Sequence, residues 1–179
     1  MWDRTAAIAA AATALAGAGI AGAADRPSRG HATCARQSAA GFPAAYGNAG
    51  NLVVGPLVLV GGRVFTPPET VRRVGGMKYP ALLTPGHTVR VALSPRARRI
   101  AALTYADGLH AVRRLDDGLR VVTFHGCDRR HARSRAGRRT VTFWSGFILA
   151  SAPSCLHLKV WIDGARRPRH ARVPLGRAC

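Results

Sequence analysis

Acidic residues are scarce in this sequence, where Asp and Glu together number 8 against 27 Lys and Arg. A hydrolase that uses paired carboxylates needs two acids that converge in a cleft. Asp107, Asp117 and Asp163 each precede a glycine at a turn signal, so few acids are left for such a site. We therefore predict no catalytic residue, and a secreted hydrolase with another kind of site is the alternative.

Long apolar runs are also lacking beyond residue 24, where no stretch approaches the roughly 20 residues of a membrane-spanning helix. The uncharged stretch 5–24 follows the charged residues Asp3 and Arg4 and ends in Ala21-Gly22-Ala23. This layout is typical of a secretory signal peptide with a small-residue cleavage site. We predict a signal peptide at 1–24, with a retained membrane anchor as the alternative.

Lysine is nearly absent, since Lys78 and Lys159 are the only two and arginine supplies almost all of the positive charge. With abundant Ala, Gly and Pro, this is what a GC-rich coding sequence produces. Such a bias does not account for the shortage of acids, so the net charge of +19 predicts a strongly basic surface. A surface of this kind attracts polyanions.

Aromatic residues make up only 6% of the chain. Proteins that bind single strands stack bases on aromatic platforms, and many duplex readers insert a helix into the major groove. No paired aromatic platform is visible, and no stretch beyond residue 24 keeps an apolar 3.6-residue period for three turns. Specific nucleic-acid recognition is therefore not predicted, and non-specific nucleic-acid binding is an alternative function.

What the sequence does contain is a series of short apolar runs separated by turn signals, which is typical of an all-β domain. Several runs alternate strictly: Leu156, Leu158 and Val160 fall on one face of a strand, while His157 and Lys159 fall on the other. The runs are Leu52 to Val60, Thr70 to Val74, Thr88 to Leu93, Arg99 to Tyr105, Leu109 to Leu115, Leu119 to Phe124, Thr140 to Trp144, Phe147 to Ala150, Leu156 to Ile162 and His170 to Leu175.

Asp-Gly pairs between these runs favour tight hairpins. Ten short strands with frequent turns predict two antiparallel sheets packed face to face, an Ig-like or jelly-roll-like β-sandwich, with a closed barrel as the runner-up. The stretch 25–50 is rich in Gly, Ala, Ser and Pro, so we expect a flexible linker that becomes ordered near Cys34 or Phe42. The predicted organisation is a signal peptide at 1–24, this linker, and the sandwich domain at 51–179.

The four cysteines, an even count in a chain expected to be exported, predict two disulfides. We favour Cys127 with Cys155, which would clamp a basic loop, and Cys34 with Cys179, which would tie the linker to the C-terminus. The leading rival pairs Cys34 with Cys127 and Cys155 with Cys179, because Cys155 and Cys179 flank one hairpin.

The segment HGCDRRHARSRAGRRTVTFW, residues 125–144, combines one cysteine and two histidines with a run of arginines. His125, Cys127 and His131 are zinc-ligand types, but their spacing matches no common zinc pattern, so neither a metal nor another cofactor is predicted. Guanidinium groups bind phosphate bidentately, so the loop is either solvated or an anion contact. The candidate anion-binding residues are Arg129, Arg130, Arg133, Arg135, Arg138 and Arg139.

Ser145 is a weak candidate nucleophile. Its neighbours, Phe-Trp-Ser-Gly, lack the Gly-x-Ser-x-Gly elbow pattern, and the residues after it look like a strand instead of a helix. An enzyme would need a cleft in which His125 or His87 meets Asp128 or Ser145.

The stretches NLVVGPLVLVGG, PGHTVRVAL, VTFWSGFILASAPSCLHLKVWIDG and RVPLGRAC resemble a family of uncharacterised exported proteins from GC-rich, actinobacterial-type genomes. The resemblance covers about 51–179, and its most specific pieces are the Trp-Ser-Gly-Phe strand, the Cys155 strand and the terminal Leu-Gly-x-x-Cys. It implies an envelope or extracellular protein without an assigned activity, and it transfers no site residue.

These observations predict a secreted or cell-envelope protein that acts as a binding or structural module. Its expected partners are anionic envelope polymers or lipid headgroups.

Export is directly testable. Protein recovered outside the cell should have an N-terminus near Ala24 or Asp25, because the small residues before them form the predicted cleavage site. N-terminal sequencing measures this, and an intact Met1 on protein confined to the cytosol would contradict the prediction.

Overall fold

The computed structural model describes residues 28–34, 37–38, 42–106, 109, 113–131, 133 and 137–179. The predicted signal peptide at 1–24, the Asp107-Gly108 turn and Arg135 lie outside the described residues. The described chain is mostly β-structure in three sheets, with one α-helix and two disulfides.

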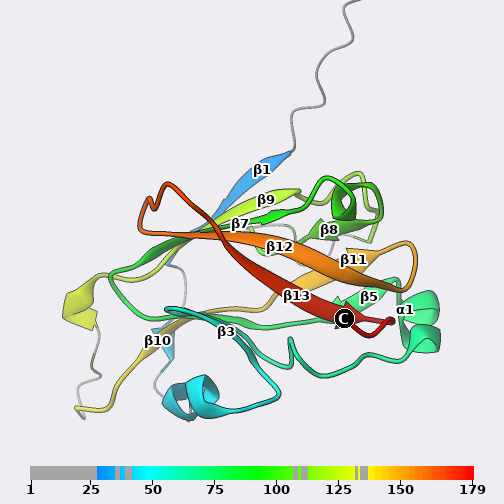
Figure 1. Ribbon diagram of the computed structural model, residues 1–179. Helices are drawn as coiled ribbons and strands as arrows, with labels where there is room; N and C mark the ends of the chain where they lie inside the picture. The colour runs from blue at the N-terminus through cyan, green and yellow to red at the C-terminus, as the bar shows by residue number, and fades with distance from the viewer. Residues whose placement is uncertain are drawn as a thin grey trace, which may run out of the picture.

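The first sheet has five strands in the order β1-β9-β7-β12-β13 (Figure 1). Along β7, Val89, Val91 and Leu93 are buried, whereas Thr88 and Arg90 are exposed, which is the period of a strand with one face in the core. The strands are β1 Arg29–Ala32, β9 Val121–His125, β7 Thr88–Leu93, β12 Ser154–Ile162 and β13 Arg169–Leu175.

The second sheet has the order β2-β10-β6-β4-β3, and the third has the order β5-β11-β8. β10 leads into β11 through Ser145 and Gly146, so one stretch of chain serves both sheets. The strands of the second sheet are β2 Gln37–Ser38, β10 Val141–Trp144, β6 Ala81–Leu83, β4 Leu57–Leu59 and β3 Leu52–Val54. Those of the third are β5 Gly76–Lys78, β11 Phe147–Ala150 and β8 Ala101–Leu103.

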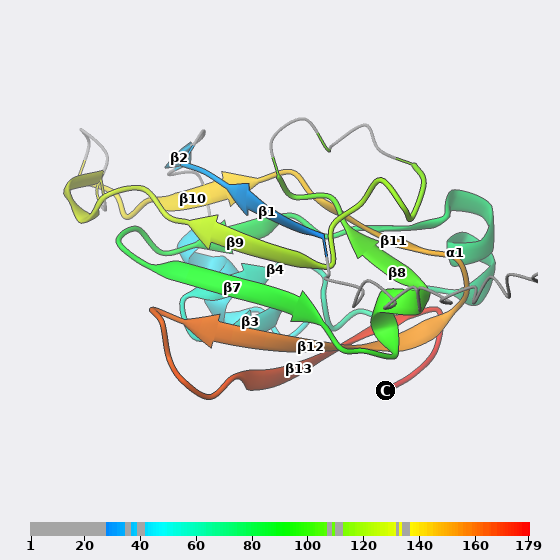
Figure 2. The ribbon, with the colours of Figure 1, turned by 90° about the horizontal axis from the view of Figure 1, so that it is seen from above.

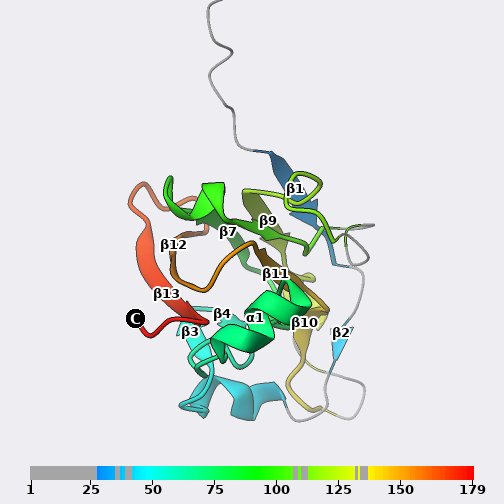
Figure 3. The same cartoon turned by 90° about the vertical axis from the view of Figure 1, so that its right-hand side faces the viewer.

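One apolar core joins the three sheets. Seen end-on, β7 and β9 lie across the molecule from β3 and β4 (Figure 3). The core contains Val91 and Leu158 from the first sheet, Leu57 and Leu83 from the second, and Ile148 from the third. The two five-stranded sheets therefore bury their apolar faces against the same cluster.

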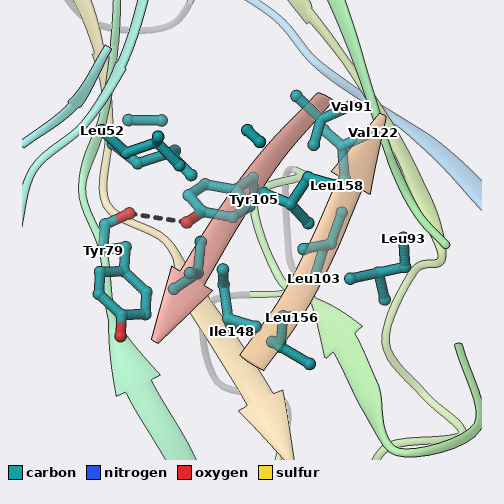
Figure 4. Packing of buried hydrophobic residues seen from close by; sticks show 14 of the residues in the cluster. Leu52, Tyr79, Val91, Leu93, Leu103, Tyr105, Val122, Ile148, Leu156 and Leu158 are labelled. Carbon is teal, nitrogen blue, oxygen red and sulfur yellow. Dashed lines mark hydrogen bonds between the residues drawn. The ribbon is translucent and has the colours of Figure 1, made fainter. Parts of the chain in front are cut away.

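Tyr105, just after β8, connects this core to the loops around it (Figure 4). Its hydroxyl donates a buried hydrogen bond of 2.7 Å to the backbone oxygen of Tyr79, and the Tyr79 hydroxyl shares a buried hydrogen bond of 3.0 Å with Thr66. Burial raises the pKa of Tyr105 far above its usual range, so the phenol remains a donor. The backbone N–H of Tyr79 donates to the Gly146 oxygen at 3.1 Å.

The run Thr70 to Val74, predicted as a strand, is part of helix α1, Pro68–Val74. Proline in the first turn, Glu69 beside it and Gly75 in the left-handed conformation at the C-terminal end are start and stop signals that outweigh the β-branched composition. The shorter 3-10 helices are η1 Phe42–Gly47, η2 Ala97–Arg99 and η4 Arg129–His131.

The stretch predicted as a linker, which we expected to become ordered near Cys34 or Phe42, contains a strand of the first sheet. β1 lies inside the stretch 25–50 and pairs in parallel with β9, with Arg29 opposite Val121 and Ala32 opposite Phe124. Ala32 is completely buried in the core. Arg-Gly-His-Ala has no apolar period, so a strand of this kind is recognised only through its partner.

Asp163 and Gly164 form the predicted tight turn, although the pairing of β12 with β13 ends at Val160 and Arg169, short of this turn. Asp163 and Gly164 both have positive φ, at 49° and 76°, and the Ala165 N–H donates to the Ile162 oxygen at 2.9 Å. Positive φ at both central residues is the turn geometry that Asp-Gly favours between antiparallel strands.

The favoured disulfide pairing is wrong, and the rival pairing is confirmed: Cys34 bonds to Cys127 and Cys155 to Cys179. The parallel pairing of β1 with β9 places Cys34 and Cys127 just beyond the ends of neighbouring strands, with Cα atoms 5.0 Å apart. Cys155 lies seven residues before Ile162 on β12, so it is roughly 20 Å along the sheet from the end where Cys127 lies.

Gly146 is the position where packing leaves no room for a side chain. A Cβ there would overlap the buried ring of Tyr105. Gly146→Ala should lower the free energy of unfolding by about 2 to 3 kcal/mol through overpacking. Gly47→Ala is the control, because nothing lies within 4 Å of its Cβ position, and equal urea midpoints for the two variants would contradict this packing.

Candidate functional site

The first sheet turns one face to solvent, and its five strands lie side by side when seen from above (Figure 2). Because the other face is buried in the core, strand alternation sends the intervening side chains outward. Many of those side chains are basic and none is acidic. They form what we call the outer basic face: Arg29, His31, Arg90, His125, His157, Lys159, Trp161, His170 and Arg172.

The register of the strands places these side chains next to one another. Arg90 lies opposite Trp161 on one neighbouring strand and opposite Thr123 on the other, and Lys159 lies opposite His170. Neighbouring strands are about 4.8 Å apart, and outward residues along one strand are about 7 Å apart. Cations at such spacing repel one another, so an anion placed among them gains Coulomb energy.

No carboxylate on these strands offsets that charge. The described acids lie elsewhere: Glu69 on α1, Asp116 and Asp117 in the turn before β9, Asp128 beyond its end, and Asp163 in the β12–β13 turn. Among the described residues, the two ion pairs are Asp163 with His87 and Asp128 with Arg130. The outer basic face therefore keeps its positive charge.

Trp161 provides a flat aromatic surface in this face. The Arg90 guanidinium carbon lies 4.1 Å from the centroid of the Trp161 ring. This cation–π contact holds the guanidinium group in place without neutralising it. Arg90 is therefore ordered while its N–H donors stay open to an anionic partner.

His31 and His125 meet at the end of β1 and β9 beside the Cys34–Cys127 disulfide. His31 Nδ1 and His125 Nε2 are 2.8 Å apart, and the ring planes differ by 15°. The ring centroids are 5.1 Å apart, so the rings meet edge to edge through one shared proton. Cys127 of the considered metal pattern is in a disulfide, and the described residues hold no cluster of three or more metal-binding side chains.

His87 pairs with Asp163 and not with Asp128 or Ser145, the partners that the enzyme alternative required. The His87 Nδ1 and Asp163 Oδ2 atoms are 2.7 Å apart, and the Thr88 N–H donates to Asp163 Oδ1 at 2.9 Å. The Thr88 N–H, followed by His87, lowers the pKa of Asp163. This arrangement fixes the β12–β13 turn to the start of β7.

The predicted arginine loop does not form one cluster of free cations in the described chain. Arg130 pairs with Asp128 at 2.8 Å, and Arg133 donates to the Gly137 oxygen at 2.8 Å. Arg129 packs its side chain against Gly86. Arg138 and Arg139 are exposed, and Arg135 lies outside the described residues.

A groove lies between β3 and β13, the edge strands of the two five-stranded sheets. Its volume is about 550 Å³. We call it the edge groove, and its lining residues are Leu52, Val53, Val54, Gly55, Arg63, Arg169, His170, Ala171 and Arg172.

The chain matches no protein-family model, and neither a curated protein nor a solved structure matches it. The resemblance to exported actinobacterial-type proteins therefore stays an expectation. The described part of the chain contains no helix long and apolar enough to cross a membrane. Two disulfides are typical of proteins outside the reducing cytoplasm.

The sequence carried part of the signal for the outer basic face. The alternation of His157, Lys159 and Trp161 against apolar neighbours predicts that these three share an exposed face. It does not predict that Arg90 lies beside Trp161 or that Arg29 joins the same sheet. The two-residue period along a strand does not determine which strands pair.

The Asp163 contacts generate a pH dependence. Because the folded state lowers the pKa of this carboxyl, its contribution is complete above the ordinary value of 3.8 and is lost as the pH falls through the folded-state pKa. Wild type should exceed Asp163→Asn in urea stability at pH 7 by less than about 1 kcal/mol, since the pair is partly exposed. The difference should narrow as the pH falls below 3.8 and through the folded-state pKa of Asp163.

Asp128→Asn removes one exposed negative charge and is the matched control. If the stability difference from wild type follows the same pH curve in both variants, the contacts to Thr88 and His87 do not lower the pKa of Asp163.

Proposed function

We propose that this protein is an exported, basic β-sandwich that serves as a binding or structural module of the cell envelope or extracellular space. Its partners would be anionic polymers or lipid headgroups. The two disulfides and the pair of sheets facing one core support the exported sandwich, and its Ig-like or jelly-roll form stays a prediction.

The observation that carries the proposal is the outer basic face. The strands of this five-stranded sheet carry no carboxylate on their solvent face. They carry Arg29, Arg90, Lys159 and Arg172 there. Rigid strands hold these charges at fixed spacing, so binding a polyanion orders few side chains of the protein. A repeating anionic chain would contact several of the cations at once, and its affinity would fall steeply with salt.

The two alternative functions are a secreted hydrolase and a non-specific nucleic-acid binder. A hydrolase would need a catalytic group in a cleft, and the candidate His87 instead pairs with Asp163 at the β12–β13 turn. Non-specific nucleic-acid binding uses the same electrostatics as any polyanion. Trp161 is the observation that favours it, because bases stack on aromatic rings.

The test compares three sets of Arg or Lys to Ser changes, each removing three charges. The first is Arg29, Arg90 and Lys159 in the outer basic face, the second is Arg133, Arg138 and Arg139 in the predicted loop, and the third is Arg72, Arg73 and Arg166 elsewhere. Retention on anionic vesicles and on immobilised polyphosphate is measured at several salt concentrations.

The first set should weaken retention about tenfold at low salt, since three charge contacts each contribute a few tenths to 1 kcal/mol. The other sets should weaken it less, and the urea midpoints should stay close to wild type. Equal losses from all three sets would mean that net charge alone drives retention. Preferential retention on single-stranded DNA that depends on Trp161 would favour the nucleic-acid alternative.

A further inference from the structure

The edge groove exposes backbone groups of both strands that border it. The Pro174 oxygen points away from β12, because it accepts a hydrogen bond from the Thr66 N–H at 3.1 Å. Backbone groups of alternate residues in a strand point to the same side. The N–H and C=O groups of His170 and Arg172 therefore also point away from β12, toward the edge groove.

The opposite wall has the same property. Val54 lies opposite Leu57 across a two-residue turn in which Gly55 has a φ of 61°. The backbone N–H and C=O groups of Val54 therefore point toward β4. The backbone groups of Val53 consequently point away from β4. Two sheet edges thus border one groove.

The groove is also strongly basic. The edge groove contains no Asp or Glu. An Arg169 guanidinium nitrogen lies 3.4 Å from the position that a Cβ on Gly55 would occupy, so this charge sits directly at the β3–β4 turn. In the described part of the chain, the side chains of Arg63 and Arg169 have no hydrogen-bond or ion-pair partner, and Arg172 has only a 3.5 Å contact to the Cys179 oxygen.

We propose that the edge groove binds an extended, acidic peptide segment of another protein, which adds as a strand to the free edge of β13. Main-chain hydrogen bonds to His170 and Arg172 would supply affinity, and Arg63 and Arg169 would select Asp or Glu side chains. A second copy of this chain fits poorly, because two chains of net charge +19 repel each other. This site shares His170 and Arg172 with the outer basic face, but it would use their backbone groups, and Arg63 and Arg169 belong to the groove alone.

The probe is a fluorescein-labelled peptide that alternates Glu with Thr, measured by fluorescence anisotropy on the purified protein. One control peptide carries N-methyl groups on alternate amides, and another has Gln in place of Glu. The first removes only backbone donors, and it should bind about tenfold more weakly, because it loses two or three main-chain hydrogen bonds to the β13 edge. The Gln peptide should lose a similar factor.

Protein variants separate the groove from the outer basic face. Arg63→Ser with Arg169→Ser should weaken peptide binding about tenfold, because two exposed ion pairs with the peptide would be lost. Arg29→Ser with Lys159→Ser removes the same charge and should leave most of the binding. His170→Pro should weaken binding more than His170→Ala, because it deletes an N–H that β12 does not use; Pro174 shows that this strand accepts proline in the same phase.

The peptide controls keep the test decisive even if His170→Pro fails to fold. Equal binding of the N-methylated peptide, together with full competition by polyphosphate, would show an anion patch and overturn the strand-addition proposal. Absence of binding by the Glu peptide at low salt would overturn it as well. Neither result bears on vesicle retention by the outer basic face.

Discussion

Alternation along the strands of the first sheet is the constraint on which the rest of this molecule depends. Each strand must bury its apolar residues against one shared core, because an unpaired cation there would cost several kcal/mol. The residues that alternate with these apolar residues therefore lie on the solvent face. With so few acids in the sequence, satisfying the core also gathers positive charge on one surface. The basic surface is therefore a consequence of how the chain folds.

The N-terminal edge of that surface depends on the Cys34–Cys127 disulfide. β1 has four residues and lies at the edge of the first sheet, where it is held by its pairing with β9, the buried Ala32 and the hydrogen bond from Trp144 Nε1 to the Thr33 oxygen. Cross-linking residues separated by 93 positions removes chain entropy worth about 4.5 kcal/mol from the unfolded state. This bond adds to the contacts that place Arg29 and His31 in the sheet, and an oxidising compartment would permit it to form. Export and polyanion binding, proposed separately, are linked through one covalent bond.

Local sequence patterns correctly predicted those features of the fold that are determined by residues close together in the sequence. Alternation predicted the β-class, and Asp163-Gly164 predicted its turn, because both are set within a few residues. The pattern was wrong for Thr70 to Val74, where Pro68 and Gly75 decide for a helix. It also missed β1, whose four residues have no apolar period. The favoured disulfides failed for the same reason, since the distance between Cys127 and Cys155 follows from strand order, which no local pattern contains.

The arginine loop and the outer basic face differ in how the fold leaves their charges available. The loop has the higher density, yet Arg130 and Arg133 are engaged by Asp128 and by the loop backbone. A flexible ligand gains most from cations that are already fixed and still open, which strands provide. The edge groove adds a second requirement, because its alternating backbone donors and acceptors match the backbone of an extended peptide. Under the two proposals, the outer basic face would select anions by the spacing of charge, and the edge groove would select them by hydrogen bonds along a strand.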